Sequence, residues 1–278
     1  MTPELDSSPK GEGEIDNELS PERQSELIGR LLQERPPKTK DRFVYYELSA
    51  ESEYANLART VEANVFMERF KEPHSQTATT YRPYEQQSIF LLAIDTKDAE
   101  AAGALRVVAN GDNGLLTLND LAEPPNDEKT APQVDIEAAL AAKGISDVSE
   151  CWDVETVAVD KKYRKVTEVS TMLYRAMYIN ARKHGVKHLV TILDENPYKK
   201  VMEPYLGIPF TAFGGLDAPF KYYNSEASYA LHGYVPEFFR EMVKHEFTTS
   251  KGWAATAAGA LTRLVWGTRD KQIQLLAA

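Results

Sequence analysis

The stretch VETVAVDKKYRKVTEVSTMLYRAM, from Val154 to Met177, joins an apolar run to a basic turn and then to a helical pattern. Its first part lies in CWDVETVAVD, residues 151–160, which alternates and then runs apolar as a central strand does. After the turn, apolar residues recur on one face of a helix that we expect to start near Thr167 and to end at Gly185. Free backbone N–H groups and the helix dipole make such a helix N-terminus a good place for an anion. The charge pattern alone fits a solvated charged turn equally well.

The bulk composition limits the class of protein. The chain has 278 residues, a net charge of -10 and a pI near 5.1, which argues against a general nucleic-acid binder because phosphate backbones favour a basic face. The single cysteine, Cys151, excludes an internal disulfide and a zinc site built on paired cysteines, so we expect no metal. The chain has no apolar run of membrane-spanning length and no apolar core of a signal peptide near its start. We therefore expect a cytoplasmic protein.

Three regions differ in composition. Residues 1–40 are polar, acidic and interrupted by Pro and Gly, so we expect a disordered tail that contains a short helix capped by Ser20. Residues 41–233 carry the patterns of a folded domain, and residues 234–278 read as a C-terminal helical extension. In that extension, an apolar stripe within 253–265 would allow docking on the domain, formation of a homodimer or binding to a membrane surface, and we favour docking.

Local patterns predict the elements of the domain. A first helix is expected over 51–70, and another over 135–145 that Gly144 ends. The predicted strands are 88–95, 101–109, 151–160, 188–194, 208–213 and 228–234.

Two longer segments resemble a known superfamily. VAVDKKYRKVTEVSTMLYRAM (157–177) and HLVTILDENPYKKVMEPYLGIPF (188–210) are similar to the core of the GCN5-related N-acetyltransferases (GNAT). Upstream, FLLAID, AGALRVV and LLTLNDL (115–121) are similar to the early strands of the autoinducer synthases and N-acyl amino acid synthases, a branch of the same fold. The resemblance covers roughly residues 43 to 232. It implies a GNAT-type α/β fold with a mixed, mostly antiparallel central sheet flanked by helices.

The resemblance also implies an activity and a donor site. It suggests acyl transfer to an amine-bearing small molecule from an acyl thioester, either acyl-CoA or an acyl carrier protein, without a permanently bound cofactor. The donor would lie against Val157, Val159, Arg164, Lys165, Thr167, Val169, Ser170 and Asn196. Thr167 and Val169 occupy the two glycine positions of the family's pyrophosphate loop, where a β-branched side chain restricts the approach of phosphate to the backbone.

The carboxylates of the central strand are candidates for the chemistry. Asp153 and Glu155 are two residues apart and should project from one face of the strand, so either could be the general base. Each could equally be an ordinary charge or an ion-pair partner. The family's usual Tyr position is Glu203 in this chain, so Tyr198 and Tyr205 are the candidate proton donors for the leaving thiolate, although an aromatic residue on an amphipathic helix is more often part of the core.

Two alternatives remain beside the acyltransferase prediction. Because the glycines of the phosphate loop are missing, the chain could be a catalytically silent GNAT-like binding or regulatory module. It could also be an interaction protein that works through its C-terminal helices. Thr156 stands where the autoinducer synthases place a characteristic Arg, which disfavours a homoserine-lactone product.

Overall fold

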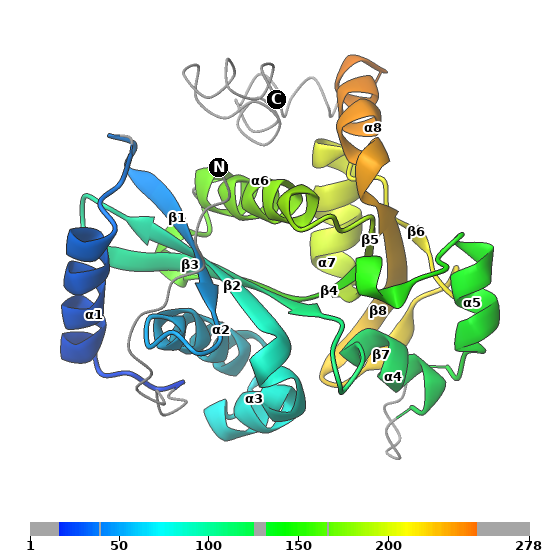
Figure 1. The fold of residues 1–278 in the computed structure, drawn as a ribbon, viewed down its shortest axis with the longest axis horizontal. Helices are drawn as coiled ribbons and strands as arrows, with labels where there is room; N and C mark the ends of the chain where they lie inside the picture. Colours follow the sequence, from blue (N-terminus) through cyan, green and yellow to red (C-terminus); the bar gives the residue numbers. More distant parts are fainter. Residues whose placement is uncertain (1–16, 39, 125–131, 166, 249–278) are drawn as a thin grey trace.

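The computed structural model describes residues 17–38, 40–124, 132–165 and 167–248. Its centre is an eight-stranded sheet in the order β1-β2-β3-β4-β5-β8-β6, with β7 also paired to β8. The strands are β1 Phe43–Ser49, β2 Ser88–Asp95, β3 Glu100–Ala109, β4 Cys151–Val159, β5 His188–Asp194, β6 Thr211–Ala212, β7 Phe220–Tyr222 and β8 Ser225–Tyr234. Only β4 and β5 run parallel. The predicted fold class, a mixed and mostly antiparallel sheet flanked by helices, is confirmed (Figure 1).

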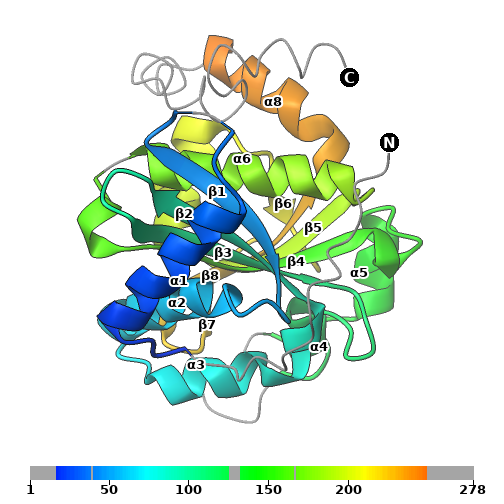
Figure 2. The ribbon, with the colours of Figure 1, turned by 60° about the vertical axis from the view of Figure 1, so that its left-hand side comes forward.

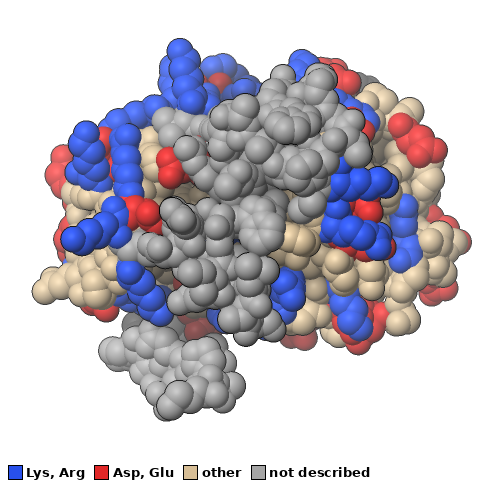
Figure 3. Space-filling model, turned by 90° about the horizontal axis from the view of Figure 1, so that it is seen from above, with Lys and Arg blue, Asp and Glu red and all other residues tan. Residues whose placement is uncertain are grey.

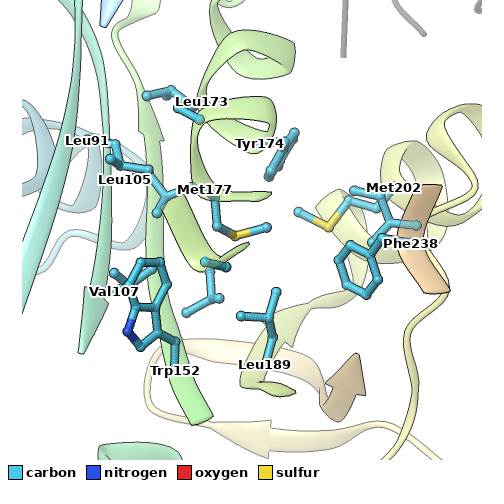
Figure 4. Packing of buried hydrophobic residues seen from close by; sticks show 14 of the residues in the cluster. Leu91, Leu105, Val107, Trp152, Leu173, Tyr174, Met177, Leu189, Met202 and Phe238 are labelled. Carbon is cyan, nitrogen blue, oxygen red and sulfur yellow. The ribbon is translucent and has the colours of Figure 1, made fainter. Parts of the chain in front are cut away.

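Helices cover both faces of this sheet. α6 Thr167–Lys183 and α8 Val235–Thr248 lie on one face, and α1 Pro21–Glu34 and α2 Ala55–Phe70 lie on the other (Figure 2). The remaining helical segments are α3 His74–Tyr81, α4 Leu116–Ala122, α5 Ile136–Ala142, α7 Glu195–Pro197, the short turns η1 Arg82–Gln87, η2 Val148–Glu150 and η3 Lys161–Tyr163, and the π-helical η4 Tyr198–Leu206. On the α6 face, Met177, Leu189 and Phe238 belong to one apolar core (Figure 4). Apolar side chains thus hold both layers to the sheet.

Helix α1 belongs to the folded domain. Ser20 caps its first turn, as predicted. The side chains of its apolar face are at most 2% exposed and pack with residues of α2, β1 and β2; they are Leu27, Ile28 and Leu31. The expectation of a disordered tail over 1–40 is therefore wrong for α1, because average composition does not register three apolar residues at helical spacing. Residues 1–16 lie outside the described part of the chain.

Other predicted elements agree with the structure or are corrected by it. The strands expected at 88–95 and 188–194 are confirmed as β2 and β5. The stretch 115–121, compared above to a strand, forms helix α4 instead, and its early backbone N–H at Thr117 is bonded by a side chain from β4. The strand expected at 208–213 is reduced to the two residues of β6. The apolar stripe at 253–265 lies outside the described residues.

Candidate active site

Strands β4 and β5 separate in the middle of the sheet. Their parallel pairing runs from Cys151 opposite His188 to Asp153 opposite Val190, and β4 then continues to Val159 without β5 beside it. The hydroxyl of Thr191 donates a 2.6 Å hydrogen bond to the carbonyl of Val154 at the point of separation. The backbone of β4 beyond this point therefore borders an opening in the sheet.

A β-bulge lies at the same place on the other edge of β4. Val154 pairs with Val107 of β3 and Thr156 pairs with Arg106, so Glu155 is an extra residue without a partner of its own in the register. A bulge breaks the strict alternation of side chains and re-aims one of them. As a result, Thr156 reaches Glu62 of α2, on the face of the sheet opposite α6, while Glu155 interacts with the carboxyl of Asp153.

Asp153 is fully buried, with 0% of its surface exposed. One of its oxygens, Oδ2, accepts a 2.7 Å hydrogen bond from the backbone N–H of Thr117 in α4. The other, Oδ1, receives no hydrogen bond from an N–H or hydroxyl group of the described residues, and the side chain of Asp153 is hydrogen-bonded to the Glu155 carboxyl. Burial raises the pKa of Asp153 to about 6, while hydrogen bonding from Glu155 and Thr117 acts in the opposite direction. A buried carboxyl with so few donors is costly to ionise, which favours a proton there.

Glu155 completes a pair of interacting carboxyls. Its residue surface is partly exposed, but its Oε1 is enclosed and has no hydrogen-bond partner among the described residues. Burial raises the pKa of Glu155 well above its usual range, and the adjacent Asp153 raises it further. Two neighbouring carboxyls cannot both ionise easily, so the pair holds a proton near neutral pH and titrates as a unit.

Tyrosines and a third acid surround this pair. Asp120 of α4 accepts hydrogen bonds from the hydroxyls of Tyr222 and Tyr223, at 2.6 and 3.4 Å. Burial raises the pKa of Asp120, while these two bonds oppose the rise. Burial also raises the pKa of the buried Tyr81 hydroxyl, and the charge of Glu155 adds to that effect. Four segments far apart in the sequence, α3, α4, β4 and the β7–β8 hairpin, thus contribute to one polar cluster.

Beside the pair lies a buried network of two arginines and two glutamates. Arg106 of β3 contacts Glu62 at 2.7 Å and Glu85 at 2.9 Å, and Arg59 contacts Glu85 as well. Burial and Asp153 raise the pKa of Glu155, and the charge of Arg106 opposes part of that rise, so the network acts on the carboxyl pair. Sequence reasoning missed this network. The sequence did contain a signal for it, because Arg106 lies inside the apolar run AAGALRVVA and a buried charge needs a partner of opposite charge.

Beyond the point of separation, the backbone N–H and carbonyl groups of every second residue of β4 point toward the opening. The N–H of Asp160 bonds to Ala102 of β3, whereas the carbonyl of Val159 accepts a 3.1 Å bond from Arg164 Nε and so faces away from β3. Backbone groups of an antiparallel strand alternate between its two sides. The N–H of Val157, two residues before Val159, therefore points toward the opening.

Cations of the basic turn are paired with acids of the same chain. Arg164 makes two bonds to Glu68 of α2, at 2.8 and 3.1 Å, and Lys161 lies 3.8 Å from the same carboxylate. Lys162 bonds to Glu100 at 2.6 Å and to an aspartate of the β2–β3 turn. Lys165 is exposed and has no ion pair within the described residues. Where the surface is visible in Figure 3, which looks onto the α6 side, Lys and Arg side chains lie next to acidic ones.

The remaining predicted donor residues lie near the start of α6 and after β5. Val169 is fully buried against the sheet, where a side chain on Gly103 of β3 would come within 3.1 Å of it. Its side chain thus fills the core, and Ser170 next to it is half-buried. Asn196 is exposed in α7, and its amide oxygen accepts a bond from Lys200. The side chains of Thr167 and Tyr205 lie outside the described part of the structure.

The lone cysteine is structural. Cys151 is 0% exposed, and burial raises the pKa of its thiol to about 12, so the nucleophilic thiolate is scarce. Within the described ranges, no group of three or more His, Cys, Asp and Glu side chains is placed to hold a metal ion. Over the same ranges, the helices are too short or too polar to cross a membrane.

Comparison with known proteins gives matches only among solved structures. No protein family profile and no curated protein sequence matches the chain. FeeM, an N-acyl amino acid synthase from uncultured soil microbes, matches with a TM-score of 0.49 and 19% identity, over 75% of this chain and 99% of FeeM. The acyl-homoserine lactone synthase LasI matches with a TM-score of 0.45 and 14% identity, over 69% of this chain and 90% of LasI. The CoA-dependent acyl-homoserine lactone synthase BjaI matches with a TM-score of 0.44 and 12% identity, over 78% of this chain and 99% of BjaI.

These matches fall in the branch to which the sequence motifs were compared. Their TM-scores are below 0.5 and their identities below 20%. What this chain does must therefore come from the geometry of its own side chains.

Proposed function

We propose that the protein transfers an acyl group from an acyl thioester to an amine, with the Asp153–Glu155 pair as the general base. The observation that carries the proposal is the position of this pair at the bulge of β4, beside the opening where β4 and β5 separate. Raised pKa values in such a place are typical of acid–base residues, because a base works best when its pKa is near the working pH.

The reaction needs three events. The amine nitrogen attacks the thioester carbonyl carbon and gives its proton to the carboxyl pair. The developing oxyanion is stabilised by a backbone N–H, for which Val157 is our candidate, and the neighbouring Val159 lines the same strand edge. The C–S bond then breaks, and the thiolate takes a proton, for which Tyr205 remains the candidate donor.

The donor would enter from the start of α6. Lys165 is exposed there. Arg164 forms a partly exposed ion pair with Glu68, and a phosphate could replace the Glu68 carboxylate in that pair. Thr167, Ser170, Asn196 and the backbone of Val169 complete the proposed donor-binding region. Either coenzyme A or the phosphopantetheine arm of an acyl carrier protein supplies a thioester and a phosphate of the required kind.

One observation favours a second candidate function, a silent binding or regulatory module. Lys161, Lys162 and Arg164 are already neutralised by acids of the same chain. Val169 lies in the core where the family has a glycine. Such a turn could be purely structural, with no donor bound.

The experiment combines donor binding with two matched variants. Calorimetry with acyl-CoA and with acyl carrier protein should show binding to the intact protein. Glu155→Gln and Asp153→Asn keep shape while removing charge, and the variant that removes the base should lower turnover about a hundredfold or more without weakening donor binding. In the intact protein, turnover should rise with pH through the region near 6, because the base must lose its proton. Normal turnover in both variants would exclude the pair as the base, and absence of donor binding would favour the silent module.

A further inference from the structure

Two side chains on the side of α6 that points away from the sheet are buried. Val169 and Leu173 of α6 face the sheet, because a side chain on Gly103 of β3 would come within 3.1 Å of both. Thr171 and Arg175 stand two residues before and after Leu173, so a helix of about 3.6 residues per turn directs both away from the sheet. We call these two residues the outer strip. Even so, Thr171 is 3% exposed and Arg175 is 8% exposed. The outer side of such a helix is normally solvated, so this burial indicates a further layer over the outer strip.

The described neighbours of α6 lie on either flank of the outer strip. Tyr178 of α6 stacks on Phe238 of α8, with 6.3 Å between the ring centres. An apolar crevice lies at this contact and is lined by Tyr174, Met177, Tyr178, Ile208, Phe238 and Met242 (Figure 4). On the other flank, Lys183 at the end of α6 bonds to Glu47 of β1 at 2.8 Å. The outer strip runs between these two flanks.

The burial of Arg175 indicates what the covering layer supplies. Its Nε has no hydrogen-bond partner among the described residues. Burial lowers the pKa of Arg175, and the opposing influence comes from the Tyr45 hydroxyl rather than from a carboxylate. Arginine stays charged and presents several N–H donors, so a buried guanidinium needs acceptor oxygens. A layer over the outer strip must therefore bring apolar surface together with carbonyl or carboxylate oxygens.

The chain that follows α8 is long enough to form this layer. The Phe238 contact anchors α8 to α6, and from there to Thr248 the helix extends about 15 Å. Five further residues can span up to about 16 Å when extended. The chain can therefore return to α6 by Trp253, where the predicted apolar stripe begins, and a further 25 residues follow that position.

The composition of residues 249–278 also fits this layer. The apolar stripe offers surface for the crevice and the outer strip; its members are Trp253, Ala257, Leu261, Leu264 and Val265. The segment contains four cations and one acid, whereas the whole chain has a net charge of -10. The segment and the rest of the chain are therefore oppositely charged, which favours their contact.

We propose that residues 249–278 dock on the outer side of α6. The apolar stripe lies over the outer strip and the crevice beside α8, and oxygens of the segment accept hydrogen bonds from the Arg175 guanidinium. This contact does not depend on the proposed acyl transfer. Because Thr171 is about one turn beyond Thr167, the docked segment borders the proposed donor-binding region at the start of α6.

Cysteine labelling of the full chain tests this contact. The single native cysteine, Cys151, is 0% exposed, so one introduced thiol reports its own surroundings. Thr171→Cys replaces a covered residue, and Arg182→Cys replaces an exposed residue on the same side of α6. A maleimide should react with the thiol at 171 at least about tenfold more slowly than with the thiol at 182, because the segment must first open. Equal rates would overturn the proposal.

A charge in the apolar stripe should release this protection. Added to Thr171→Cys, Leu261→Asp should speed labelling about tenfold or more, because a carboxylate cannot enter the apolar contact without cost. Thr262→Asp brings the same charge on another side of the predicted helix and should change the rate little. Labelling of Arg182→Cys should be the same with either substitution. No acceleration by Leu261→Asp, or equal acceleration by Thr262→Asp, would overturn the proposal.

A matched pair of arginine variants tests the role of Arg175. Arg175→Met keeps most of the side-chain bulk and removes the hydrogen-bond donors, so it should speed labelling at 171 by about threefold or more. Arg182→Met, at the exposed position, should leave that rate unchanged. An unchanged rate in Arg175→Met would overturn the assignment of Arg175 as the hydrogen-bond donor to the segment.

Dilution distinguishes the segment from a second copy of the chain. Protection by a segment of the same chain should survive about a hundredfold dilution, whereas protection by a second copy should fall by mass action. Loss of protection on dilution, together with a dimer in sedimentation, would overturn the proposal and assign the outer side of α6 to a homodimer contact.

Discussion

The buried ion network offers a sharp test of how the site is supported. Replacing Arg106 with Met keeps most of the side-chain volume and removes the guanidinium. Arg106 supplies three of the four hydrogen bonds described for Glu62, and the fourth comes from Thr156. Both partners of the pair are at most 3% exposed. The substitution therefore leaves Glu62 as a buried carboxylate with a single hydroxyl donor.

The expected loss of unfolding free energy follows from the charge of Glu62 that Arg106→Met leaves unpaired. Breaking a buried pair by removing one partner costs about 3–5 kcal/mol, because an uncompensated charge stays behind. Glu85 keeps Arg59, so the cost should come mainly from Glu62. With a urea m-value of about 3 kcal/mol/M for a domain of this size, the midpoint should fall by about 1–1.7 M.

A double variant separates the charge from the packing. Arg106→Met combined with Glu62→Gln restores one arginine against one glutamate, so it should recover about 2 kcal/mol or more of the single variant's loss. Urea unfolding followed by circular dichroism measures all three proteins. A loss below about 1 kcal/mol for Arg106→Met, or a double variant that loses the sum of both single effects, would refute the argument that this network is a desolvated, charge-balanced unit.

Four further outcomes are expected. Leu31→Ala in α1 should cost about 2–5 kcal/mol and its half-buried neighbour Leu32→Ala clearly less, as measured by chemical unfolding. Gly103→Ala should cost about 1–3 kcal/mol, because the new methyl group would lie 3.0–3.1 Å from atoms of β4 and α6; a thermal scan would show it. Glu68→Ala frees Arg164, so anion binding at the basic turn should strengthen in calorimetry if the donor binds there, and should stay absent if the turn is structural. Because burial raises the pKa of the Asp153 carboxyl in the folded state, the unfolded chain releases its proton first as pH rises; the free energy of unfolding should fall between about pH 4 and 6, and Asp153→Asn should flatten that slope in unfolding measured across pH.

Local patterns were sufficient to place several strands of the sheet. The strand periodicities at β2, β4 and β5 and the cap of α1 at Ser20 depend on neighbours in the chain, so they could be read directly. The same holds for the turn glycine Gly144, whose positive φ of 68° follows the end of α5. The prediction that Asp153 and Glu155 lie together agrees with their interacting carboxyls, although a bulge sets the direction of Glu155; their role as the base stays a proposal.

Tertiary structure decided the features that connect distant segments. The pairing of Arg106 with Glu62 joins residues 44 apart, and the bonds from Tyr222 and Tyr223 to Asp120 join residues about a hundred apart. It also decided that α4 is a helix, since a buried carboxylate from β4 bonds one of its first N–H groups. The sequence by itself determined several strands and helices, such as β2, β4, β5 and α1, because hydrophobic periodicity is local, but it missed β1 and misread α4. Only the folded chain determined the charges of the site, because a pKa depends on burial and on neighbours that the sequence does not place.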